Sequence, residues 1–178
     1  MRPALPALCG LVLLLGSGCL PDAEGDAPPP QEISREQSGY YCGMIVADHP
    51  GPKGQIFVGD AAQPIWFPSV RDAIAFLMLP GEQKNVRAMY VNDMARAGSW
   101  TAPAPGTWVD AQDAWYVLDS GKRGGMGLAE AVPFGTRGDA EAFIETHGGR
   151  LARLSEIPTS YIFDTVESDP PTGDGGQS

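Results

Sequence analysis

Two stretches of the chain repeat the same order of apolar and polar residues at a constant spacing. Six positions of the first stretch recur in the second: Phe67, Ser69, Asp72, Ala73, Ala75 and Phe76 correspond to Phe134, Thr136, Asp139, Ala140, Ala142 and Phe143. In both copies a hydroxyl residue comes three positions before an aspartate, as in a capping box that begins a helix. This internal repeat predicts helices over about residues 70–79 and 137–146.

Short apolar stretches with the length of strands surround each predicted helix. Two precede and one follows it, at residues 55–58, 64–67 and 87–92 in the first half and at 114–118, 129–134 and 150–154 in the second. Each half therefore has the order strand, strand, helix, strand. We expect an α+β protein of two ββαβ units related by the internal repeat, with mainly antiparallel sheets and one helix each.

Composition sets the boundaries of these units. We place the first unit at residues 39–98 and the second at 107–166, joined by a connector at 99–106 that is rich in Pro and small residues. Residues 19–38 are rich in Pro, Asp, Glu and Gln and have few core-forming side chains, which predicts a disordered tether. A similar composition at 167–178 predicts a disordered tail.

The start of the chain has the anatomy of a secretory signal. A short apolar run follows Arg2 and gives way to small residues just before Cys19. The run is too short to span a bilayer. We interpret residues 1–18 as a lipoprotein signal peptide and Cys19 as the lipid attachment site; an ordinary cleaved signal is the alternative. The mature protein would face the periplasm, anchored by its lipid to either the inner or the outer membrane.

The charge of the chain limits its partners. The formal net charge is −10 and the isoelectric point is about 4.5. An acidic surface argues against nucleic-acid binding and against electrostatic attachment to anionic lipid. Membrane attachment should therefore depend on the lipid.

Once the signal is removed and Cys19 is acylated, Cys42 is the only free thiol. In an extended segment Cys42 and Met44 would project from the same face, so that both sulfurs could reach one ion. Copper(I) binds thiolate and thioether at low coordination number, whereas a structural zinc site needs four ligands of the Cys/His kind. The pattern favours a Cu(I) site; a buried structural cysteine is the alternative.

Three further residues are candidate ligands. Met126 lies in Gly124-Gly125-Met126-Gly127, where it is either an anchor onto the core or a side chain held out to bind a ligand. His49 and His147 are either exposed or capping residues, or one of them is a nitrogen ligand. We expect Met78 and Met89 to be core residues.

Several motifs, in their order along the chain, resemble the NosL family of nitrous oxide reductase accessory lipoproteins. The resemblance covers about residues 40–158 and rests on Cys42-Gly43-Met44, His49-Pro50-Gly51-Pro52, Met126-Gly127, Pro133-Phe134 and the helix end at Gly148-Gly149. It implies two ββαβ units and a periplasm-facing copper(I) chaperone for the copper-sulfide centre of nitrous oxide reductase. It also implies delivery through a membrane transporter complex and its periplasmic partner protein.

The same resemblance makes Cys42 and Met44 copper ligands and Met126 the third candidate. Tyr40-Tyr41 stands where the family more usually has a further cysteine or a proline-containing lead-in, so Cys42 is expected to be the sole thiolate. We expect no catalytic residue and no enzyme, because the chain has neither a phosphate loop nor a nucleophile-base pattern. The alternatives are a lipoprotein scaffold that binds a protein partner and an organomercurial-lyase-like enzyme.

Overall fold

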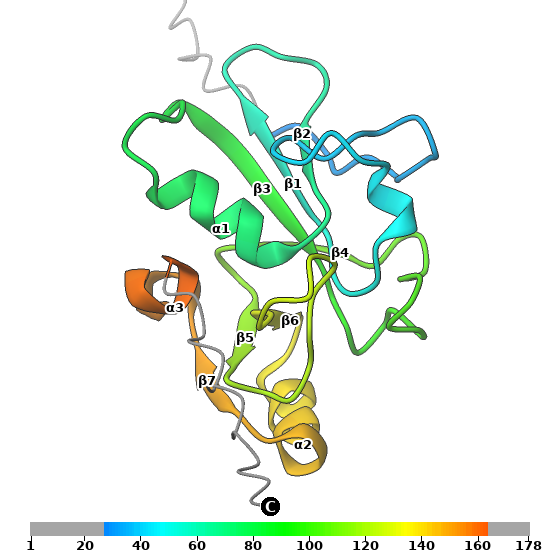
Figure 1. Ribbon diagram of the computed structural model, residues 1–178, viewed down its shortest axis with the longest axis vertical. Helices are drawn as coiled ribbons and strands as arrows, with labels where there is room; N and C mark the ends of the chain where they lie inside the picture. The colour runs from blue at the N-terminus through cyan, green and yellow to red at the C-terminus, as the bar shows by residue number, and fades with distance from the viewer. Residues whose placement is uncertain (1–26, 164–178) are drawn as a thin grey trace, which may run out of the picture.

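A computed structural model describes residues 27–163 of the chain. The predicted signal peptide, Cys19 and the predicted tail at 167–178 lie outside these residues. No helix within the described part is both long enough and apolar enough to cross a membrane. The described chain forms two antiparallel sheets, each with its own helix (Figure 1).

The first sheet is formed by strands between residues 54 and 110. Its strand order is β2-β1-β3-β4, and all neighbours are antiparallel. Helix α1 connects β2 to β3 and lies across one face of this sheet (Figure 1). The elements are β1 (Gly54–Val58), β2 (Ile65–Phe67), α1 (Val70–Met78), β3 (Val86–Asn92) and β4 (Trp108–Asp110), preceded by a short 3-10 helix, η1 (Val46–Asp48).

The second sheet has the corresponding arrangement. Its strand order is β6-β5-β7, again antiparallel, and helix α2 connects β6 to β7. The elements are β5 (Trp115–Leu118), β6 (Val132–Phe134), α2 (Arg137–His147) and β7 (Arg150–Ala152), followed by η2 (Leu154–Glu156) and α3 (Thr159–Phe163). The predicted α+β class with antiparallel sheets is confirmed, and both halves have the order strand, strand, helix, strand.

The two predicted helix starts are also confirmed. The Ser69 hydroxyl accepts a hydrogen bond from the Asp72 backbone N–H at 3.1 Å, and Thr136 accepts one from Asp139 at 3.2 Å. Each cap satisfies one of the N–H groups that a helix leaves unpaired in its first turn. The beginning of α1, beside which the candidate site lies, is therefore held in place.

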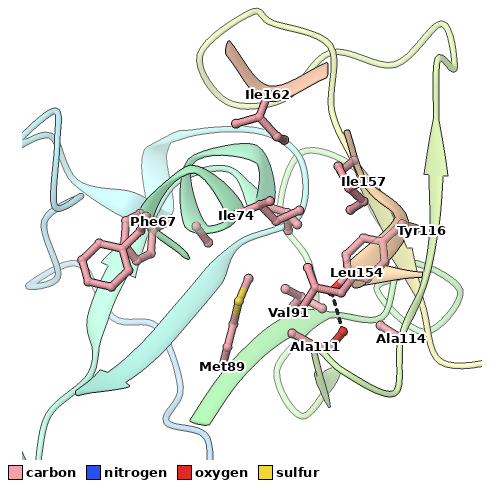
Figure 2. Close-up of a cluster of buried hydrophobic side chains, with 14 of the residues drawn as sticks. Phe67, Ile74, Met89, Val91, Ala111, Ala114, Tyr116, Leu154, Ile157 and Ile162 are labelled. Atoms are coloured by element: carbon pink, nitrogen blue, oxygen red, sulfur yellow. Dashed lines mark hydrogen bonds between the residues drawn. The ribbon is translucent and has the colours of Figure 1, made fainter. Parts of the chain in front are cut away.

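One large hydrophobic cluster joins the two halves. It includes Phe67, Ile74 and Met89 from the first half and Tyr116 and Leu154 from the second (Figure 2). Tyr116 is fully buried, and its hydroxyl donates to the Ala111 carbonyl at 2.8 Å, which satisfies a polar group that burial would otherwise penalise. The sheets therefore share this cluster, and a smaller second cluster, Val117, Val132, Phe134 and Ala140, lies on the second sheet.

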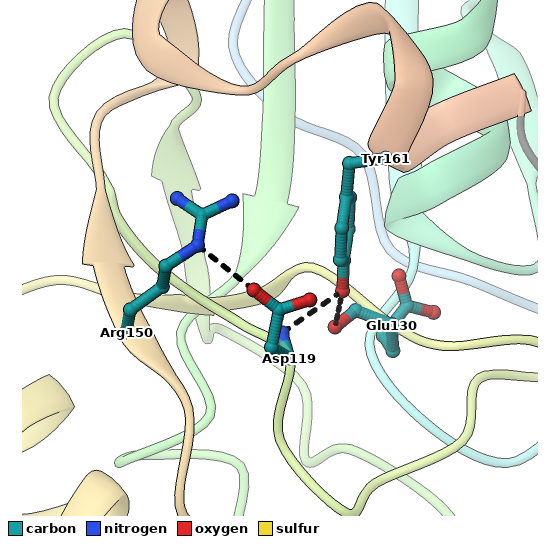
Figure 3. A network of polar contacts seen from close by, with 4 residues as sticks. All are labelled: Asp119, Glu130, Arg150 and Tyr161. Atoms are coloured by element: carbon teal, nitrogen blue, oxygen red, sulfur yellow. Dashed lines mark hydrogen bonds and ion pairs between the residues drawn. The ribbon is translucent and has the colours of Figure 1, made fainter.

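Polar contacts fix the C-terminal helix against the same region. The Tyr161 hydroxyl donates to the Glu130 carbonyl at 3.0 Å and accepts from the Asp119 N–H at 3.4 Å (Figure 3). Asp119 also forms an ion pair with Arg150 at 2.8 Å. Glu130 is thus held at its backbone by α3, while its carboxyl group points away from Tyr161.

Two boundaries differ from the expectation. Within the predicted tether, the described part from residue 27 lies against the first sheet: Tyr90 donates to the Pro28 carbonyl at 2.8 Å, and Gln31 and Gln55 exchange two hydrogen bonds. This segment has too few hydrophobic residues to offset the entropy lost on ordering, but its hydrogen bonds to the sheet do so. The prediction of a disordered tether is therefore wrong for this part. In addition, β4 pairs with β3 although it follows the connector.

Candidate metal centre

The first predicted ligands lie on a closed turn. The Gly39 N–H donates to the Met44 carbonyl and the Gly43 N–H donates to the Gly39 carbonyl, both at 2.8 Å. We expected an extended segment here, but the chain turns at Gly43, whose φ of 68° belongs to the left-handed region that favours glycine. Cys42 is half-buried and lies outside both hydrophobic clusters, whereas the Met44 side chain is 45% exposed.

Met126 is at the tip of a second turn. Its base is closed by hydrogen bonds from the Gly124 N–H to the Leu128 carbonyl and from the Gly127 N–H to the Gly124 carbonyl, both at 2.9 Å. The Met126 side chain is 42% exposed, so it does not serve as an anchor buried in the core. Both predicted thioether ligands are thus held out by short, hydrogen-bonded turns.

Both turns border Pro68, the residue before the N-cap of α1. A Cβ placed on Gly39 would lie 2.7 Å from Cys42 Sγ and 3.0 Å from Pro68 Cδ. A Cβ placed on Gly125 would lie 2.7 Å from the Pro68 carbonyl oxygen. No side chain fits at either glycine without displacing its neighbour, so the two turns pack closely around one point of the backbone.

His49 lies against the Met126 turn. Its Nδ1 is 3.0 Å from the Gly125 carbonyl oxygen, and a Cβ on Gly125 would lie 2.7 Å from His49 Cβ. The ring is close enough to Asp72 to influence that carboxyl: burial raises the pKa of Asp72, and the Ser69 hydrogen bond and the Arg71 and His49 charges oppose the rise. Of the two histidines, His49 is therefore the one near the sulfur-bearing turns.

His147 is the last residue of α2, which lies on the second sheet, away from α1 (Figure 1). Its ring stacks on Phe143 at 4.4 Å between centroids, and it lines a groove of about 280 Å³ together with Met94 and Trp100. Met89 is a core residue, 5% exposed, as expected.

Tyr40 and Tyr41 are part of the Cys42 turn and connect it to Glu82, just after α1. The hydroxyls of Tyr40 and Tyr41 donate to the two carboxylate oxygens of Glu82 at 3.1 and 3.0 Å. The Tyr40 ring also packs against Phe76, with 5.6 Å between centroids. The hydrogen bond to Glu82 is the largest cause that raises the pKa of Tyr40; burial is the largest for Tyr41, whose pKa is raised as well. Both rings therefore stay neutral donors.

Two buried ionisable residues near the Met126 turn were not anticipated from the sequence. Glu130 is 1% exposed, and burial raises the pKa of its carboxyl to about 8, against the opposing backbone hydrogen bond from Arg71. Lys53 is equally buried, and burial lowers the pKa of its ammonium to about 8. Glu130 and Met126 line a small cavity of about 10 Å³, about the space of one water.

The donor atoms available here are unusual for a hard metal ion. Within the part of the chain that the structure describes, no group of three or more His, Cys, Asp or Glu side chains could hold a metal. The sulfur atoms of Cys42, Met44 and Met126 are the donors that the two turns present instead. Thiolate and thioether donors suit a soft ion such as monovalent copper.

The paired sheets and the two sulfur-bearing turns define an α+β protein with a candidate soft-metal site beside the start of its first helix. The family model described as NosL matches residues 30–162, and the chain belongs to this family. The resemblance noted from the sequence motifs is therefore confirmed.

Individual relatives agree with this assignment. A protein of Achromobacter cycloclastes named copper-binding lipoprotein NosL is 41% identical over 162 residues, which cover 90% of this chain and 83% of the relative. A protein of Stutzerimonas stutzeri with the same name is 36% identical over 123 residues, 69% of this chain and 63% of the relative. The crystal structure of the copper chaperone NosL from Shewanella denitrificans is 34% identical, with a TM-score of 0.70 over 75% of this chain and 98% of that one.

Proposed function

We propose that this protein is a lipid-anchored, periplasm-facing copper(I) chaperone that delivers copper for the copper-sulfide centre of nitrous oxide reductase. The observation that carries the proposal is the meeting of the Cys42 and Met126 turns at Pro68. The names of the relatives, copper-binding lipoprotein and copper chaperone, support the copper-binding part of this proposal. Attachment would occur through Cys19, which precedes the described residues.

Copper(I) is the cargo of this site, with Cys42, Met44 and Met126 as its ligands. The Cys42 thiolate would neutralise the charge of the ion, and the neutral thioethers would complete a low-coordinate site. His49 is the nearer nitrogen donor, although its Nδ1 already contacts the Gly125 carbonyl at 3.0 Å. Cys42 is half-buried, and the neighbouring Met44 is exposed.

Release of the copper would proceed by ligand exchange. Met44 and Met126 are 45% and 42% exposed, so an incoming thioether or imidazole can bind the ion before these ligands leave. Every step then keeps the ion coordinated, and no free copper forms. The thiolate would leave last, because it carries the charge that compensates the ion.

The surface around the ligands suits a docking partner. Of the large apolar side chains that are well exposed within the described part, five lie on the two turns or next to them: Tyr40, Tyr41, Met44, Met126 and Leu128. Exposed apolar groups gathered at one place are typical of protein contact sites. The family's transporter complex and its periplasmic partner protein are the partners that we propose for this surface.

Titration with copper(I) against a competing chelator tests the ligands. We expect Cys42→Ser to weaken binding by about 100-fold or more and Met44→Ala and Met126→Ala by about 10-fold each, since the thioethers are neutral. Met89→Leu is the matched control, because it replaces a core thioether, 5% exposed, by a side chain of similar volume. Equal affinity of all variants and the parent would refute the site.

Delivery needs a test in cells. In a strain that lacks this protein, we expect nitrous oxide reductase to be made without its copper-sulfide centre, detected by the visible absorption of the purified enzyme. The parent chain should restore the centre, Cys42→Ser should not, and Cys19→Ser should do so less well. A normal centre in the deletion strain would contradict delivery to this enzyme while leaving copper binding intact.

A further inference from the structure

Glu130 has a buried carboxyl group in which one oxygen accepts hydrogen bonds and the other has no hydrogen-bond partner among the described residues. Its Oε1 accepts hydrogen bonds from the backbone N–H groups of Arg71 at 2.9 Å and Ala131 at 3.0 Å. Its Oε2 has no hydrogen-bond partner among the described residues, although the side chain is 1% exposed. Leaving a polar atom unpaired in the interior costs stability, which calls for a reason why this side chain is placed here.

The unpaired oxygen faces the base of the Met126 turn. A Cβ on Gly124 would lie 2.1 Å from Glu130 Oε2 and 2.9 Å from its carboxyl carbon, so the Gly124 backbone rests directly on the carboxyl group. Gly124 closes the turn through its hydrogen bonds to Leu128 and Gly127. The position of the carboxyl group therefore fixes the position of the turn and of Met126.

The other oxygen holds the start of α1. Arg71, whose N–H donates to Oε1, lies in the first turn of the helix, just after Ser69 and Pro68. Pro68 in turn lies beside Cys42 and Gly125. The Glu130 carboxyl group thus contacts both the start of α1 and the turn that carries Met126. The Cys42 turn packs against the same start of α1.

We propose that Glu130 is a positioning residue that sets the distance between the Met126 sulfur and the Cys42 thiolate. This inference rests on the proposed function, in which copper binds between these two sulfurs. Glu130 does not touch the ion; it holds the Met126 turn at the separation that the helix start defines. Groups that orient metal ligands in this way commonly change metal affinity by about 10- to 100-fold when removed.

A double-mutant cycle separates this role from a general effect on folding. Copper(I) affinity of the full chain is measured at pH 7 against a competing chelator for the parent, Glu130→Ala, Met126→Leu and the double variant. We expect each single change to weaken binding by about 10-fold and the double change to weaken it no further, because both remove the same thioether contact. Glu130→Gln keeps the shape of the side chain and should bind copper like the parent.

A second variant perturbs the same contact from the turn. Gly124→Ala places a methyl group against the Glu130 carboxyl, so it should displace Met126 and lower the affinity by about the same factor as Met126→Leu. If circular dichroism shows that Glu130→Ala does not fold, Gly124→Ala takes its place as the test variant. Gly138→Ala is the matched control: a Cβ there meets nothing within 4 Å, and affinity should not change.

The outcomes distinguish the inference from the function on which it rests. Additive losses in the cycle, parent affinity for Gly124→Ala, or equal losses for Glu130→Gln and Glu130→Ala would overturn the positioning role while leaving the copper site in place. Parent affinity for Met126→Leu would remove Met126 as a ligand and this inference with it. Absence of copper(I) binding by the parent would overturn the proposed function itself.

Discussion

The buried Glu130 carboxyl makes stability depend on pH in a direction that the structure defines. Burial is the largest cause that raises the pKa of Glu130, from the ordinary value of 4.5 to about 8. Between these two values the folded protein keeps a proton that the unfolded chain has released. The contribution of Glu130 is therefore fully present below about pH 4.5 and is lost as the pH rises toward 8.

The size of this effect follows from the difference between the two pKa values. Each pH unit inside the window lowers the free energy of unfolding by about 1.4 kcal/mol for one proton. From pH 5 to pH 7.5 the loss amounts to roughly 3 kcal/mol, a large share of the stability of an ordinary domain. Lys53 has little effect over most of the window, because the pKa of its ammonium, lowered to about 8 by burial, leaves it mostly charged up to pH 7.

Glu130→Gln removes the titrating group and keeps the shape of the side chain. Urea unfolding of the metal-free chain, followed by circular dichroism at several pH values from 5 to 7.5, gives the free energy of unfolding of parent and variant. We expect the variant to gain roughly 3 kcal/mol relative to the parent across this range. Glu145→Gln is the control, since this α2 side chain is exposed to water.

A constant difference between parent and Glu130→Gln over the whole range would refute this reasoning. It would mean that the folded protein binds no more protons at residue 130 than the unfolded chain does. A growing difference in the control as large as in Glu130→Gln would also refute it, because the effect would then not come from burial.

Three further predictions concern the supports of the site and the core. Gly39→Ala would place a Cβ 2.7 Å from Cys42 Sγ, so we expect weaker copper(I) binding in a chelator competition without loss of fold by circular dichroism. Ser69→Ala removes the helix cap and should lower the free energy of unfolding by about 1 kcal/mol in urea. Phe76→Ala empties a fully buried position and should cost about 3–5 kcal/mol in the same assay. Unchanged values for any of the three would contradict the contact concerned.

Much of the fold could be predicted because its signals are local. The capping residues Ser69 and Thr136 act on N–H groups three positions away, so both helix starts are visible in the sequence. The strands are short apolar runs between turn-forming residues, and their order follows from the chain. Local signals did not reveal that residues 27–38 pack on the sheet through Gln31 and Tyr90, since both bonds join distant segments.

The candidate site was predictable only as a set of residue types. Cys42 and Met126 are recognisable as candidate ligands in the sequence, because a lone thiol and a methionine among glycines need an explanation in any fold. Glu130 gave no such signal: an isolated glutamate between alanines is ordinary, and nothing in its neighbours indicates that it is buried. Its role depends on Gly124 and Arg71, which the fold brings to its two carboxyl oxygens.

The sequence by itself determined which sulfur-bearing side chains are available, the charge of the chain and the two ββαβ halves, because these depend on residue type and on spacing along a few turns or strands. Only the tertiary structure decided that the Cys42 and Met126 turns meet at Pro68, that His49 rather than His147 lies beside them, and that one buried carboxyl contacts both the start of α1 and Gly124. Contacts between segments so far apart in the chain arise from packing around the shared core, which no local pattern records.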